Sequence, residues 1–179
     1  FVEELQEPPY RRFLRKLYGL RPMKLSFHWH WSESGNSVSP HCDSRSKIGS
    51  HIFYLNTDDD WKAEWGGQTL VLDDHGKLNW QSAPEFSEFE EPIVADAIGN
   101  RSMAFKRTPH SWHGVKAIDC PDGYFRKVFI VAVERGRQAE QPHGGGQHRK
   151  AHRDLEFFHP RAGLGQKLEP RRLPAQHDI

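Results

Sequence analysis

Short apolar runs separated by turn residues constrain the fold of this 179-residue chain more than any other feature. The runs cover residues 51–55, 69–72, 102–105, 112–115 and 126–133, and they are rich in β-branched and aromatic side chains. Glycine, asparagine and aspartate stand between them, and no helical periodicity intervenes. A succession of short strands without helices between them is typical of a β-sandwich or barrel.

Two segments that contain histidine carry the clearest chemical signal. His41 and Asp43 are two residues apart, so in an extended backbone their side chains point the same way and can bind one ion together. A third ligand would come from a distant strand, and His113, between Trp112 and Val115, is suitably placed. Two imidazoles and one carboxylate suit Fe(II) and leave other coordination positions open.

Alternatives to this interpretation stay open. His110 stands three residues before His113 and competes with it as the third ligand. Residues 41–43 also fit a polar turn after Pro40, with Asp43 capping the residues that follow.

The ordered residues resemble the 2-oxoglutarate and Fe(II)-dependent dioxygenases, specifically their prolyl-4-hydroxylase-like branch. The matching elements are the HxD pair at 41–43, the Tyr-Leu-Asn to Gly-Gly-x-Thr-Leu block at 54–70, Phe105 eight residues before His113, and Arg126 at the start of the last core run. The similarity covers roughly residues 23–134. It implies a mainly β fold, a double-stranded β-helix or jelly roll with a flanking N-terminal helix, whose open mouth holds the iron.

The resemblance also implies roles for individual residues. His41, Asp43 and His113 become the catalytic iron ligands, and Arg126 grips the distal carboxylate of the cosubstrate 2-oxoglutarate. Arginine suits that task because its planar fork binds a carboxylate bidentately and stays charged. Lys127 is the neighbouring residue that could bind the carboxylate instead. The residues on both faces of this strand are apolar, so the sequence pattern does not show to which face Arg126 points.

A second cosubstrate anchor is expected upstream of the first ligand. The prolyl hydroxylases often hold 2-oxoglutarate with a tyrosine about ten residues before that ligand, where this chain has Trp31. An indole N–H can donate a hydrogen bond, although it cannot copy a phenol hydroxyl. We therefore expect Trp31 to contact the cosubstrate.

The implied reaction is hydroxylation of a small-molecule or peptidyl substrate, with an amino-acid or prolyl residue as the leading candidate. Conversion of 2-oxoglutarate and O2 to succinate and CO2 accompanies it, with ascorbate as a supporting reductant. The carboxylate of Asp43 favours hydroxylation over halogenation, because the related halogenases lack that ligand. Asp119 stands where the nucleic-acid demethylase branch has arginine, which disfavours DNA repair. Two alternatives remain: a cupin-like metal-binding jelly roll that does not use 2-oxoglutarate, and a non-catalytic binding relative.

Charge and cysteine content narrow the partners and the location. A net charge of +1 argues against dominant electrostatic attraction to nucleic acid or membrane. The sequence has no long apolar stretch typical of a membrane helix and no signal peptide. With only two cysteines and no CxxC spacing, a cytoplasmic location is the expectation. The sequence carries no prediction of oligomeric state.

One structured domain is expected over residues 1–134. An amphipathic helix over 9–20 should pack on the outside of a β core that spans 23–134. From 135 to 179 the composition shifts to histidine, arginine, glycine, glutamine and proline. This shift predicts a polar, mobile tail with one helical turn near 153–158.

Overall fold

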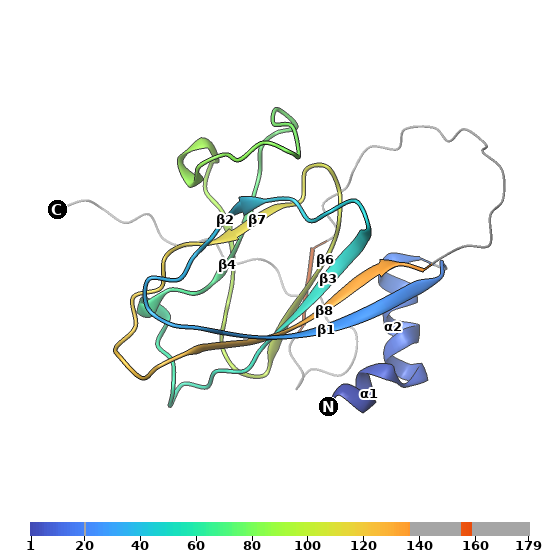
Figure 1. The fold of residues 1–179 in the computed structure, drawn as a ribbon, viewed down its shortest axis with the longest axis horizontal. Coiled ribbons are helices and arrows are strands. Elements are labelled where there is room, and N and C mark those ends of the chain that lie inside the picture. Colours follow the sequence, from blue (N-terminus) through green and yellow to red (C-terminus); the bar gives the residue numbers. More distant parts are fainter. Residues whose placement is uncertain (20, 137–154, 159–179) are drawn as a thin grey trace.

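The computed structural model describes residues 1–19, 21–136 and 155–158. Within these residues two antiparallel β-sheets pack face to face, and two α-helices lie against the outer face of one sheet (Figure 1). This arrangement confirms the predicted mainly β, jelly-roll fold with a flanking N-terminal helical segment. In the described ranges, no helix has both the length and the apolar character that a membrane crossing requires.

Each sheet alternates strands that are distant in sequence. The larger sheet has the order β1-β8-β3-β6-β9, formed by β1 (Met23–Ser32), β3 (Lys47–Tyr54), β6 (Arg101–Lys106), β8 (Arg126–Arg135) and β9 (Leu155–Phe158). The smaller sheet has the order β2-β7-β4-β5, formed by β2 (Val38–His41), β4 (Thr69–Leu72), β5 (Ile93–Ala95) and β7 (Trp112–Val115). Short 3-10 helices, η1 (Ala63–Trp65) and η2 (Phe86–Glu88), lie in the loops before β4 and β5.

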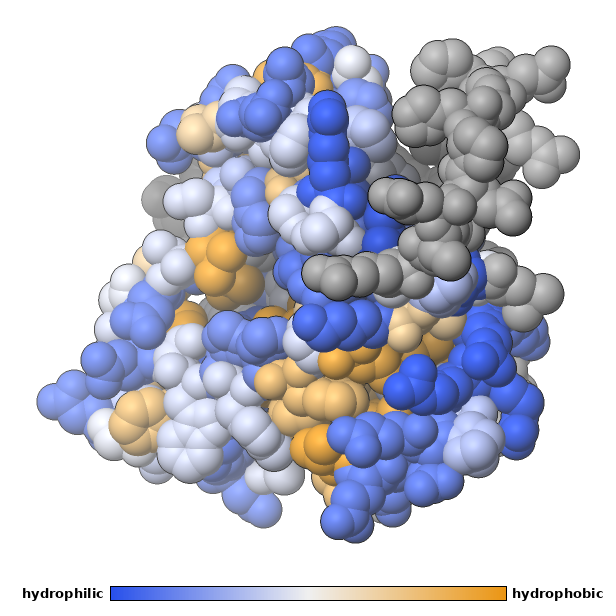
Figure 2. All heavy atoms as spheres, turned by 45° about the vertical axis from the view of Figure 1, so that its right-hand side comes forward, coloured by the Kyte–Doolittle hydropathy of each residue, from blue (hydrophilic) through white to orange (hydrophobic). Residues whose placement is uncertain are grey.

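Both faces of the larger sheet are covered. In β8, Val128 and Ile130 face the core between the sheets, whereas Phe129, Val131 and Val133 belong to the cluster beneath the helices. This double burial explains why both alternate sets of residues in β8 are apolar. Figure 2 shows a contiguous apolar area in the lower middle of the face that it displays, bordered by hydrophilic residues.

The N-terminal segment forms two helices where one was predicted over 9–20. They are α1 (Val2–Gln6) and α2 (Pro8–Tyr18), separated by Glu7, which has an extended ψ of 156°. A residue before proline is pushed out of the helical region, so the break falls at Glu7. α2 ends at Gly19, whose φ of 94° glycine adopts without strain. The predicted last helical residue, 20, lies outside the described residues.

Gly49 in β3 lets α2 approach the sheet closely. A Cβ atom at this position would lie 2.5 Å from the Tyr18 ring and 2.3 Å from the Phe105 carbonyl oxygen. The Tyr18 hydroxyl passes this point and donates a hydrogen bond to the carbonyl oxygen of Ser50 at 3.0 Å. Any larger residue at Gly49 would therefore displace the helix from β3.

Strand β9 corrects the prediction for the C-terminal segment. Residues 155–158, expected to lie in a helical turn, instead pair antiparallel with residues 102–105 of β6. The edge of β6 offers unpaired backbone groups that a strand satisfies, whereas a single helical turn leaves most of its own groups unpaired. The rest of the predicted polar tail, over 137–154 and 159–179, lies outside the described residues.

His51 is a titratable side chain buried beneath α2. It is 4% exposed, its Nδ1 lies 3.0 Å from the Tyr10 hydroxyl, and its Nε2 has no hydrogen-bond partner among the described residues. Burial lowers the pKa of His51 to about 3. In the unfolded chain histidine titrates near its ordinary value of about 6.5. The unfolded state therefore binds more protons between these two values, and stability falls as the pH drops from about 6.5 towards 3.

We expect His51→Gln to reduce this sensitivity to acid. The glutamine amide can still bond the Tyr10 hydroxyl but takes up no proton. Between about pH 6 and pH 4, the free energy of unfolding should lose up to about 1.4 kcal/mol less per pH unit than in the wild type. Urea unfolding across this range measures the slope, with His28→Gln as an exposed control. Equal slopes for the wild type and the His51 variant would contradict the assignment.

Candidate metal centre

Strands β2 and β7 bring the two predicted histidine ligands together. The strands pair antiparallel, and His41 lies directly opposite His113. Opposite residues in such a pair point to the same face, and the two imidazole centroids are 4.3 Å apart. Gly114 permits this close pairing, because a Cβ there would lie 2.8 Å from the Val38 carbonyl oxygen. The backbone register thus sets the spacing of the imidazoles.

Asp43 completes the cluster from the loop that follows β2. Its side chain is 6% exposed. The potential ligand atoms of His41, Asp43 and His113 all lie within 4.8 Å of one another. Three atoms that each stand about 2.1 Å from one ion, on one face of it, lie roughly 3 Å apart, so binding would draw the side chains closer together. The three residues predicted as ligands therefore converge on one point.

Hydrogen bonds to the backbone orient both imidazoles. Nδ1 of His41 lies 3.0 Å from the carbonyl oxygen of Ser39, and Nδ1 of His113 lies 3.0 Å from that of Ser111. A carbonyl oxygen only accepts, so each Nδ1 carries the proton and donates it. Nε2 of each ring then presents its lone pair, as metal-binding histidines do when a second partner fixes their tautomer.

Two side chains hold the Asp43 carboxylate. Lys47 donates to Oδ1 at 2.6 Å, and Ser50 donates to Oδ2 at 2.9 Å. Burial alone raises the pKa of Asp43, but the neighbouring His113, Lys47 and Ser50 outweigh it and hold the pKa below its ordinary value. Asp43 is therefore ionised at neutral pH. Each oxygen keeps a further lone pair for a cation.

His113 is neutral at the same pH. Burial, with a smaller effect from His41, lowers its pKa to about 4 against the opposing influence of Asp43. Phe105 contributes to that burial, with its ring centroid 4.6 Å from the imidazole. The neutral imidazole is the form that binds a metal ion, so His113 needs no deprotonation to act as a ligand.

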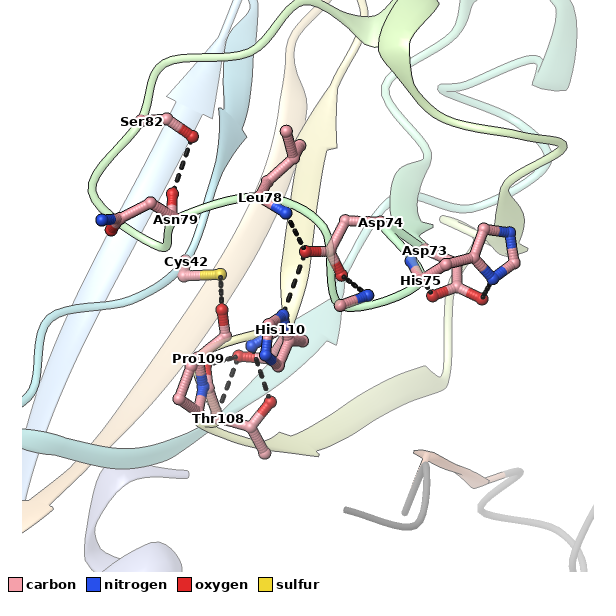
Figure 3. A network of polar contacts seen from close by, with 12 residues as sticks. Cys42, Asp73, Asp74, His75, Leu78, Asn79, Ser82, Thr108, Pro109 and His110 are labelled. Carbon is pink, nitrogen blue, oxygen red and sulfur yellow. Dashed lines mark hydrogen bonds and ion pairs between the residues drawn. The ribbon is translucent and has the colours of Figure 1, made fainter. Parts of the chain in front are cut away.

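His110, the alternative third ligand, points away from this cluster. Its Nδ1 lies 3.0 Å from Oδ2 of Asp74, in the loop after β4 (Figure 3). Asp74 also accepts hydrogen bonds from the backbone N–H groups of Gly76 and Leu78, so its carboxylate is fixed in place. The fold therefore brings His113, and not His110, to the other two ligands.

Cys42 is turned away from the centre although it lies between two of its residues. Its Sγ donates to the carbonyl oxygen of Pro109 at 3.6 Å (Figure 3). Burial raises the pKa of Cys42 to about 12. The side chain stays a neutral thiol, which is a poor metal ligand because thiolates bind metals.

Strand β8 directs Arg126 into the space between the sheets. Arg126 is 7% exposed and donates from Nε to the Gly67 carbonyl oxygen and from Nη2 to Thr69 Oγ1. Its rival Lys127 points to the opposite face and pairs with Asp60 at 2.5 Å. In the described part of the chain no carboxylate forms an ion pair with Arg126. A buried guanidinium without such a partner is suited to an anionic ligand.

Tyr54 and Thr69 line the same space and were missed by sequence reasoning. The Tyr54 hydroxyl donates to Thr69 Oγ1 at 2.9 Å, and each residue is 2% exposed. A cavity of about 240 Å³ opens beside Arg126, and Val38 and Val115 also line it. These valines lie on β2 and β7, the two strands that also carry His41 and His113. The Tyr-Leu-Asn block at 54–56 was the signal that could have found Tyr54.

Trp31, the predicted second cosubstrate anchor, is not brought to this cavity. In the pairing of β1 with β8, Trp31 lies opposite Lys127, whereas Ser32 lies opposite Arg126. Trp31 is 64% exposed, and the Lys127 ammonium stands 6.0 Å from its ring. Neighbouring residues of a strand point to opposite faces, and a count along the sequence does not determine the face. His30, one position earlier, shares the inner face.

A larger hollow of about 440 Å³ lies elsewhere on the molecule. Phe1, Phe53, Leu55 and Ile98 give it a mainly apolar lining, and none of the predicted ligands borders it. Size alone therefore does not identify the site, whereas convergent polar groups do.

Comparison with known proteins places the fold and no more. No family model matches the sequence, and no curated protein matches it. Among solved structures, the chain is similar to a prolyl-4-hydroxylase from Pseudomonas putida, with a TM-score of 0.51 and 14% identity. The match covers 72% of this chain and 62% of that one, so the chain spans less than two thirds of the hydroxylase. A likeness at this level establishes a common fold, and function has to be argued from the site.

We expect the full chain to bind one divalent cation through the triad. Loss of a residue that hydrogen-bonds a metal ligand costs about 10- to 100-fold in metal affinity. Loss of a ligand itself should cost more, so we expect His113→Ala to weaken metal binding more than about a hundredfold. His110→Ala is the matched control and should bind as the wild type does. Titration with Co(II), followed by its visible absorption, measures both. Loss of binding in the His110 variant alone would overturn the ligand assignment.

Proposed function

We propose that this chain is an Fe(II)- and 2-oxoglutarate-dependent dioxygenase that hydroxylates an amino-acid or peptidyl substrate and releases succinate and CO2. The convergence of His41, Asp43 and His113 carries this proposal. Two imidazoles and one carboxylate on one side of an ion leave several positions open, as in non-haem Fe(II) oxygenases. The fold shared with a prolyl-4-hydroxylase supports the same class.

The donor set fits catalytic iron better than structural zinc. Structural zinc sites take four protein ligands and are rich in thiolates. Here the cluster offers three ligands, and Cys42 keeps its thiol away from them. When bound, Fe(II) and 2-oxoglutarate would supply the electrons that activate O2 to oxidise a C–H bond of the substrate. The protein contributes ligation, orientation and shielding from water.

Arg126, Tyr54 and Thr69 form the proposed binding site for the distal carboxylate of 2-oxoglutarate. The guanidinium supplies the positive charge that burial of a carboxylate requires. The Thr69 hydroxyl oxygen accepts from both the Tyr54 hydroxyl and the guanidinium, so the three donors can turn towards a shared acceptor. A metal-binding jelly roll without a keto acid has no comparable use for a buried Arg126, which favours the dioxygenase over the cupin-like alternative.

The substrate is proposed to enter where the two sheets leave their edges unpaired. β1 is an edge of the larger sheet and β2 is an edge of the smaller one. His28 and His30 on the inner face of β1 are exposed and can contact a substrate there. A prolyl residue is the first candidate, because the similar solved structure is a prolyl-4-hydroxylase.

Succinate release tests this function directly. The full chain with Fe(II), ascorbate and O2 should convert 2-oxoglutarate to succinate slowly alone and faster with a member of a panel of amino acids and prolyl peptides. Asp43→Ala should abolish both activities. Absence of succinate in the wild type under every condition would overturn the proposal.

Arg126→Met should weaken 2-oxoglutarate binding and spare the metal. Removing one partner of a buried ion pair costs about 3–5 kcal/mol, which corresponds to a loss of at least a hundredfold. Anaerobic titration of the Fe(II) protein with 2-oxoglutarate, followed by the weak visible charge-transfer band, gives the dissociation constant. Unaltered cosubstrate affinity would show that another cation holds the carboxylate.

Tyr54→Phe and Trp31→Phe distinguish the two candidates for the second anchor. Loss of the Tyr54 hydroxyl removes one hydrogen bond to a charged group and should weaken 2-oxoglutarate binding about tenfold. Trp31→Phe should leave it unchanged, because that side chain lies on the outer face. The same anaerobic titration measures both variants, and the reverse ranking would restore Trp31 as the anchor.

A further inference from the structure

A group of arginines surrounds the loop that carries Asp43. Arg45 belongs to this loop, Arg107 follows β6, and Arg135 ends β8. Arg107 donates from Nε to the Asp43 carbonyl oxygen at 2.9 Å, and Arg135 donates from Nε to the Arg45 carbonyl oxygen at 3.4 Å. Three guanidinium groups are thus tied to one short segment beside the metal centre.

Trp80 provides a platform for two of these guanidinium groups. The Cζ atoms of Arg45 and Arg107 each lie 4.8 Å from the centroid of its ring. Trp80 itself packs against the buried cluster that contains Leu72 and Trp112, so its position is fixed by the outer core of the smaller sheet. Cation–π contact holds both arginines in place and leaves their N–H edges available to a ligand.

This cluster carries charges without ion-pair partners and one buried donor without a hydrogen bond among the described residues. Among residues 1–19 and 21–136, no carboxylate forms an ion pair with Arg45, Arg107 or Arg135. Nη2 of Arg107 is buried and has no hydrogen-bond partner in the same part of the chain. Like charges held together with a buried free donor favour an anion.

We propose that Arg45, Arg107 and Trp80 form an oxyanion-binding subsite for a carboxylate or phosphate group carried by the substrate. Arginine forks bind both groups through paired N–H donors. The bond from Arg107 to the backbone of Asp43 places such an anion next to the metal centre. That the anion belongs to the substrate rests on the proposed function, whereas the subsite itself rests on the unpaired donors.

This subsite is separate from the one proposed for 2-oxoglutarate. Strand β8 begins at Arg126 and ends at Arg135. Arg107 follows Lys106, which lies level with Val133 of β8 across Gly49, so at roughly 3.3 Å per residue the strand position of Arg107 is about 23 Å from that of Arg126. The two cationic groups therefore lie towards opposite ends of β8. One metal centre can thus serve a cosubstrate from one side and an anionic substrate from the other.

Binding of inorganic phosphate to the metal-free full chain tests the subsite without relying on iron or 2-oxoglutarate. The arginine Nε–H resonances of Arg45 and Arg107 should shift on titration. Arg45→Gln should weaken phosphate binding about tenfold, the value of one charge-assisted hydrogen bond. Arg12→Gln removes the same charge from the exposed face of α2 and is the control. Arg107→Lys keeps the charge but loses the fork, and should weaken binding similarly.

A pair of prolyl peptides distinguishes the sources of the anion. One carries glutamate beside proline and the other carries glutamine, and calorimetry compares them on the wild type and on Arg45→Gln. Tighter binding of the glutamate peptide, lost in the variant, assigns the anion to a polypeptide. Phosphate binding with equal peptide affinities assigns it to a small metabolite. If phosphate leaves the Arg45 and Arg107 resonances unshifted, or if the Arg12 control loses as much affinity, the subsite is overturned, even where 2-oxoglutarate binding holds.

Discussion

The antiparallel pairing of β2 with β7 is the constraint on which the rest of the site depends. His41 faces His113 only in this register, and a shift by one residue would turn one imidazole to the outer face. Gly114 keeps the strands in register, because a side chain there would meet both the Val38 carbonyl oxygen and the ring of Phe86. Backbone hydrogen bonds therefore position the two imidazoles even without a bound cation.

Successive side chains of a strand point to opposite faces, and this alternation decides which of two basic residues of β8 lies in the core. Arg126 lies opposite Ser32 on the inner face, and Lys127 lies opposite Trp31 on the outer one. The inner arginine has hydroxyl and carbonyl partners, whereas the outer lysine reaches Asp60. Strand pairing therefore places one of two adjacent cations between the sheets and the other at the surface.

The fold class and the triad could be predicted because local patterns carry them. The spacing of His41 and Asp43 and the succession of short strands can be recognised without knowing which strands pair. The face to which a strand residue points cannot, because it depends on the neighbouring strand. Counting back from His41 to Trp31 crosses the turn at 33–37 and the irregular register of β2, and so gives the wrong face. The strand at 155–158 is equally invisible, since it exists through the edge of β6.

Electrostatics then links the proposed ligands to one another. In the metal-free chain Lys47 neutralises Asp43, while Arg126 lacks a carboxylate among the described residues. A divalent cation at the triad adds positive charge beside Lys47, Arg126 and Arg107, and an incoming anion offsets that charge. Each anion should therefore bind more tightly when the metal is present. By thermodynamic reciprocity, each proposed anion would tighten metal binding by the same factor by which the metal tightens the anion.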